Sequence, residues 1–200
     1  IFKYRKMKNQ GVVAVFQRDR FDRYSNFARI GEGSLGGKGR GLAFIDTMVM
    51  RHHEFEELEN AHVAIPKTVV LCTDIFDEFM ETNDLYGIAM SDISDEEMLA
   101  CFLRGRLPHR LLADLEVFID VVKSPLAIRS SSLLEDSHYQ PFAGIYSTYM
   151  IPYDEDKYCR LEMLSNAIKS VYASVYFRGR KDYMTATSNV IDQEKMAAIL

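Results

Sequence analysis

Residues 125–136 read PLAIRSSSLLED and residues 140–149 read QPFAGIYSTY, and these two segments decide the predicted fold. The first begins with a short apolar run that ends at an arginine, followed by three serines and, after two leucines, two carboxylates. A loop bounded by proline and glycine then leads into an alternating segment. This order is typical of a strand, a polar loop and a second strand. With the helical patterns around it, it predicts an α+β fold in which helices pack on a small mixed or antiparallel sheet.

Arg129 stands where the first predicted strand leaves the core, and it is the main candidate for chemistry. Its guanidinium is permanently charged and carries five donors in a planar fork, which suits phosphate oxygens. Ser130 and the serines after it add short hydroxyl donors. Phosphate binding is therefore one interpretation of the pattern, and a solvated turn at a strand end is the other.

Composition limits the class of protein. The chain has 200 residues, 48% hydrophobic and 26% charged, so it can bury a core as one large or two small domains. A net charge of −5 argues against nucleic-acid binding. No apolar run approaches the roughly 20 residues needed to span a bilayer, and no signal peptide is visible. Three widely spaced cysteines fit reduced thiols in a cytoplasmic protein better than disulfides or a zinc site.

A glycine-rich stretch, residues 31–41 (GEGSLGGKGRG), precedes a helical pattern. Glycines let backbone amides approach an anion, and Lys38 at a helix start adds a charge. The P-loop pattern fails, because Glu32 and Gly39 stand where it needs a glycine and a Ser or Thr. A dinucleotide fold is disfavoured because residues 24–30 do not look like an apolar strand, and a kinase loop would need a valine at Lys38. A phosphate-binding loop and a flexible linker both remain open.

Apolar periodicity predicts several scaffold helices and one further strand. Helices are expected after the glycines, after Thr73 as a cap, from a Ser94–Glu97 capping box, and after Pro108. A strand is expected at residues 65–71 and a long helix at residues 156–180. Arg178 and Arg180 stand at the end of that helix pattern, where cations complement the helix dipole or supply a second phosphate contact. The domain limits predicted are residues 1–30 without assigned role, residues 31–190 as the main unit, and residues 191–200 as the start of a helix that is cut off.

Taken together, the blocks resemble the nucleotide-binding domain of the phosphoenolpyruvate synthase and pyruvate phosphate dikinase family. They are GGKG at residues 36–39, IPKTV at 65–69, IRSSS at 128–132, FAG at 142–144 and AIKSVYASVY at 167–176. The resemblance implies the first lobe of an ATP-grasp fold, with Gly36, Gly37, Lys38, Arg129 and Ser130 at the ATP phosphates and Lys38 and Arg129 as the catalytic cations. It also implies Mg²⁺, a phosphohistidine domain and a pyruvate-binding domain as partners, with release of AMP and phosphate.

The chain departs from the family at Leu133 and Leu134, where the family more often has small residues. The resemblance further implies that the metal ligands and the phosphohistidine carrier lie outside these 200 residues, so the chain is expected to be one lobe of a longer protein. Glucan and antibiotic phosphotransferases share this lobe, and a non-catalytic nucleotide sensor or interaction domain is the alternative from another class. Retention of both Lys38 and Arg129 argues against the sensor. Oligomeric state has no signal in the sequence.

Overall fold

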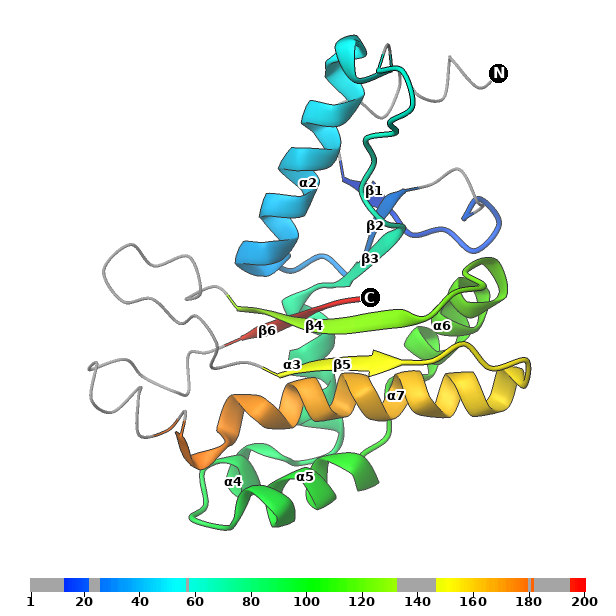
Figure 1. The fold of residues 1–200 in the computed structure, drawn as a ribbon. Coiled ribbons are helices and arrows are strands. Elements are labelled where there is room, and N and C mark those ends of the chain that lie inside the picture. The colour runs from blue at the N-terminus through cyan, green and yellow to red at the C-terminus, as the bar shows by residue number, and fades with distance from the viewer. Residues whose placement is uncertain (1–12, 22–25, 57, 133–146, 180, 182–194) are drawn as a thin grey trace.

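The computed structural model describes residues 13–21, 26–56, 58–132, 147–179, 181 and 195–200. In this part of the chain six strands form one mixed sheet, in the order β1-β2-β3-β6-β4-β5 (Figure 1). The strands are β1 (Ala14–Val15), β2 (Phe27–Ile30), β3 (Thr68–Leu71), β4 (Leu126–Ser132), β5 (Thr148–Ile151) and β6 (Met196–Ile199). The first three run parallel to one another, whereas β6 is antiparallel to β3 and β4, and β5 is antiparallel to β4. The predicted α+β class with a mixed sheet is confirmed.

Helices cover the two faces of this sheet unequally (Figure 1). One face carries α2 (Gly36–Arg51), and a short 3₁₀ turn, η1 (His53–Glu56), follows it. The opposite face carries α3 (Thr73–Thr82), α4 (Tyr86–Ala89), α5 (Asp95–Arg104), α6 (His109–Val121), α7 (Lys157–Ala173) and η2 (Ser174–Tyr176). None of the helices in these described ranges is long and apolar enough to cross a membrane.

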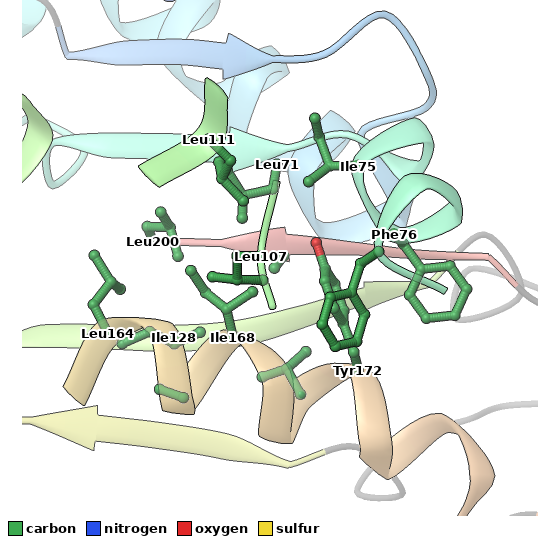
Figure 2. Packing of buried hydrophobic residues seen from close by; sticks show 14 of the residues in the cluster. Leu71, Ile75, Phe76, Leu107, Leu111, Ile128, Leu164, Ile168, Tyr172 and Leu200 are labelled. Atoms are coloured by element: carbon green, nitrogen blue, oxygen red, sulfur yellow. The ribbon is translucent and has the colours of Figure 1, made fainter. Parts of the chain in front are cut away.

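The larger core lies on the face with the larger number of helices, and Figure 2 shows its centre. Tyr172 of α7 is fully buried there, with its ring 5.1 Å from that of Phe76 and 5.6 Å from that of Phe79 between centroids. Ile128 of β4 and Ile168 of α7 pack in the same cluster. Aromatic rings bury large areas and favour tilted or edge-on contacts of this kind. The core therefore fixes β4 against α7.

A smaller core lies on the other face, beneath the first turns of α2. It contains Phe27, Val70, Ala197 and Ile199 from three strands, with Leu35, Leu42 and Ala43 packed against it. The rest of α2 stands away from the sheet, so the side chains of Phe44, Ile45 and Met48 are exposed. The apolar periodicity predicted this helix, but it did not predict that the glycine-rich first turn would make the closest contact.

Within the segment 191–200, the described residues 195–200 do not form a helix, which corrects the prediction for them. Met196–Ile199 form β6, in the middle of the sheet between β3 and β4. All four side chains are buried. The segment MAAI has good helix propensity, but a strand with both faces covered reads as a continuous apolar run rather than an alternating one. Tertiary packing therefore decides its structure.

The start of α3 and the end of α7 also differ from prediction, whereas the predicted start of α5 is confirmed. Cys72, not Thr73, is the residue preceding α3, and no side-chain cap bond is formed there. The long helix ends at Ala173 and continues only as η2, so Arg178 lies beyond it. The capping box of α5 is present as predicted, because Ser94 accepts from the amide of Glu97 and the Glu97 side chain accepts from the amide of Ser94.

Candidate functional site

The predicted phosphate arginine lies on β4, on the sheet face that α2 partly covers. Successive side chains of a strand point to opposite faces. Ser131 contacts α2, so Arg129, two residues earlier, lies on the same face as α2. Arg129 is exposed, and its partner in the β4–β5 register is Thr148, which is exposed too. Further along β5, Met150 is 69% exposed. Beside α2, this face of β4 and β5 is open to solvent.

Lys38 lies in the first turns of α2 and reaches the same part of β4. Its Nζ atom donates a hydrogen bond of 3.2 Å to the backbone carbonyl of Ser130, the residue that follows Arg129. The Lys38 side chain is half-buried. Lys38 and Arg129 are far apart in the sequence, but both therefore lie at β4. Attraction of polyphosphate oxygens is the chemistry that this arrangement supports.

Ser131 joins α2 and β4, although no sequence signal distinguishes it from the neighbouring serines. Its hydroxyl accepts from the amide of Gly39 at 2.9 Å and donates to the carbonyl of Leu35 at 2.8 Å. The side chain is completely buried. Ser130 faces the other side of the strand and is 1% exposed, so it meets Lys38 through its carbonyl.

Gly36 is the point of closest approach between α2 and β4. Its φ is +68°, and a Cβ added there would lie 2.0 Å from the carbonyl oxygen of Ser131. Both conditions require glycine, because other residues strain at positive φ and a real contact this short does not occur. Gly37 lies beside it, buried in the first turn of α2, where backbone amides have no partner within the helix.

The loop between β2 and α2 is bound to α3. The Asp74 carboxylate accepts from the amide of Glu32 at 3.0 Å and from that of Gly33 at 2.9 Å. The Thr73 hydroxyl accepts from the amide of Ser34 at 3.0 Å, and the Thr73 amide donates to the Ser34 carbonyl at 3.0 Å. These amides are thus already satisfied within the protein. From Glu32 to Ser34 the glycine loop is therefore held against α3 and is not a flexible linker.

The strand before the loop also differs from prediction. Phe27–Ile30 form β2, which is parallel to β3 and largely buried, although the sequence did not suggest a strand there. Arg29 of this strand forms a 3.0 Å ion pair with Glu32, which raises the pKa of Arg29. Its guanidinium also donates to the Gly31 carbonyl. Beneath the loop, burial raises the pKa of the Cys72 thiol to about 11.

Arg178 does not join this group. Arg178 donates to the Asp92 carboxylate at 3.1 Å, and its amide donates to Asp95 at 2.7 Å. These partners flank the start of α5, which lies on the face opposite α2 (Figure 1). Arg180 lies outside the described residues, as do residues 133–146, which include Glu135, Asp136 and the FAG block.

Lys38 and Arg129 thus lie beside an open sheet face of an α+β domain, an arrangement whose charge suits an anion. The family described as "Pyruvate phosphate dikinase, AMP/ATP-binding domain" matches residues 32–200. The chain belongs to this family and is an ATP/AMP-binding domain of the dikinase type. The match includes both the glycine loop with Lys38 and the strand with Arg129. No curated protein sequence matches the chain.

Proposed function

We propose that this chain supplies the Lys38 and Arg129 side of an ATP site in a phosphoenolpyruvate synthase-like dikinase. In such an enzyme ATP phosphorylates a histidine on a separate domain, the phosphoryl group passes to pyruvate, and AMP and phosphate are released. One observation carries the proposal: Lys38 Nζ lies 3.2 Å from the carbonyl of the residue after Arg129, beside an open sheet face. The identity of the ligand as a nucleotide rests on the family, which is described as an AMP/ATP-binding domain.

The two cations have different roles in the proposed transfer. Arg129 presents a fork that can hold two phosphoryl oxygens at once, and its backbone is fixed within the sheet. Lys38 adds a compact charge next to it, held in direction by the Ser130 carbonyl. Phosphoryl transfer depends mainly on positioning and on charge stabilisation, so these residues orient the phosphates and neutralise negative charge as it moves.

The described residues do not fit a magnesium site by themselves. Magnesium takes an octahedral set of oxygen ligands, usually with one or two carboxylates. Within the described ranges no three His, Cys, Asp or Glu residues are grouped to hold a metal. Near the loop, both oxygens of the Asp74 carboxylate accept backbone amides. We therefore assign no step to a metal held by these residues.

Arg129→Lys tests the proposal in the complete protein, with AMP release and phosphohistidine formation as readouts. The change keeps the charge and removes the fork, so the catalytic rate should fall more than ATP affinity, by about 2 to 4 kcal/mol in activation free energy. Lys38→Met should raise the ATP concentration required and slow phosphohistidine formation.

Arg51→Lys is the matched control, because Arg51 is an exposed arginine in the last turn of α2. It should change the activation free energy by no more than about 0.5 kcal/mol relative to the parent. Parental phosphohistidine formation in Arg129→Lys would reduce the resemblance to a statement about fold.

A further inference from the structure

Thr73 and Asp74, at the start of α3, hold three consecutive residues of the glycine loop. The two carboxylate oxygens of Asp74 bond the amides of Glu32 and Gly33, and Thr73 bonds Ser34 through both its hydroxyl and its amide. Hydrogen bonds from amides to a carboxylate are charge-assisted and stronger than neutral ones. Asp74 also lies in the first turn of α3, where the helix dipole favours a negative charge.

The glycines of the loop fit this contact closely. A Cβ at Gly31, whose φ is +98°, would lie 2.4 Å from Asp74 Oδ1. A Cβ at Gly33 would lie 2.6 Å from Thr73 Oγ1 and 2.7 Å from the Asp74 amide. Such distances leave no room for any side chain. Gly31 and Gly33 therefore allow the loop to approach α3 closely.

The carboxylate of Asp74 occupies the place that a phosphate takes in an open glycine loop. A phosphate that used the amides of Glu32 and Gly33 would have to displace a bound anion of the protein itself. The proposed contacts of the ATP phosphates are instead Lys38 and Arg129, at β4. The loop leads directly into the first turn of α2, so its position sets where Lys38 stands relative to Arg129.

We infer that Asp74 and Thr73 are positioning residues for ATP binding, which act through the glycine loop on Lys38 and do not touch the nucleotide. This inference rests on the proposed function of Lys38 and Arg129. Opposite the loop, Ser131 holds the next segment by its bonds to Leu35 and Gly39. The start of α2 is thereby fixed from two sides, by α3 and by β4.

The experiment is a double-mutant cycle in the complete protein, with ATP affinity measured by titration calorimetry without added magnesium, so that no turnover occurs. Asp74→Asn keeps the size of the side chain but turns an NH₂ group toward one of the two amides. It should weaken ATP binding on the order of tenfold, the scale of a lost charge-assisted bond. In a Lys38→Met background the same change should have no further effect, because the residue it positions is gone.

Thr73 offers a matched pair that serves even if Asp74→Asn does not fold. Thr73→Val removes the acceptor of the Ser34 amide at nearly constant shape and should weaken ATP binding several-fold. Thr73→Ser retains the hydroxyl and should bind ATP nearly as the parent does.

The outcomes separate the inference from the proposed function. Parental affinity in Asp74→Asn and Thr73→Val, with weakened binding in Lys38→Met, would overturn the positioning role and leave the proposed site intact. Equal weakening by Asp74→Asn in both backgrounds would show a general structural effect and overturn it as well. Parental affinity in Lys38→Met would remove the proposed site itself, and the inference with it.

Discussion

Gly36→Ala should destabilise the protein by about 2 to 5 kcal/mol, a range that follows from two separate costs. The backbone of Gly36 has a φ of +68°, and this left-handed conformation costs an L-residue about 1 to 2 kcal/mol. The new Cβ would lie 2.0 Å from the Ser131 carbonyl oxygen and 2.5 Å from Ser131 Oγ. Relief of such overpacking typically costs about 1 to 3 kcal/mol more. The carbonyl oxygen belongs to the backbone, and Oγ is held by two hydrogen bonds, so strand and helix must separate.

Equilibrium unfolding in urea measures this change, and the chain offers a control in the same helix. Gly41 has no atom within 4 Å of an added Cβ. Gly41→Ala should therefore stabilise the protein by about 0.5 to 1 kcal/mol, the ordinary gain of alanine over glycine inside a helix. The two substitutions are chemically identical and should act in opposite directions. A Gly36→Ala protein as stable as the parent would refute the close contact between α2 and β4.

Two further predictions concern buried groups near the site. Ser131→Ala should lower the free energy of unfolding by about 1 to 3 kcal/mol in the same assay, because it leaves a buried amide and carbonyl without their partner. Ser124→Ala, at an exposed position, is the control and should change it by no more than about 0.5 kcal/mol. Equal effects of the two substitutions would contradict the role of Ser131. Cys72 should resist iodoacetamide in the native state while half-buried Cys101 reacts, because burial raises its pKa from 9.0 to about 11. Its thiol stabilises the fold fully below pH 9 and loses that contribution as the pH rises through about 11. Mass spectrometry of the labelled peptides checks this, and rapid labelling of native Cys72 at pH 8 would contradict it.

Much of the scaffold was predictable because its signals are local. The capping box at Ser94 and Glu97 lies within four residues, and it forms as the sequence indicates. The periodicity of Leu164, Ile168 and Val171 places one face of α7 in the core, where all three are buried. Spacing of this kind records which side of an element is buried.

Sheet pairing was not predictable in the same way. Ala197 and Ala198 have high helix propensity, yet they form β6, which pairs with β3 and β4 and is buried along its whole length. Phe27–Ile30 include a charged residue, Arg29, so the segment was not predicted as an apolar strand. In the folded chain the Arg29 guanidinium donates to the Glu32 carboxylate and to the Gly31 carbonyl, and the sequence alone does not show these contacts.

The candidates Lys38 and Arg129 could be named from the sequence, but their geometry could not. Lys38 and Arg129 followed from their surroundings in the sequence and from the family, and the structure places both at β4. Arg178 was a candidate because it is a cation at the end of a predicted helix. In the structure it pairs with Asp92, on the sheet face opposite α2. Charge alone does not distinguish a ligand contact from an ion pair, because both place a guanidinium beside oxygen atoms.

The glycine-rich stretch shows why composition left two interpretations open. Flexibility and close approach both favour glycine, and a sequence does not separate them. Contacts with the rest of the fold do: Gly33 is held by Asp74, Gly36 lies against the Ser131 backbone, and Gly39 donates to Ser131 Oγ. Gly31, Gly33 and Gly36 stand where another chain segment comes too close for a side chain, whereas Gly41 has open space around it. A site built on this stretch gains its precision from these contacts, which explains how a glycine-rich segment can hold Lys38 in a defined place.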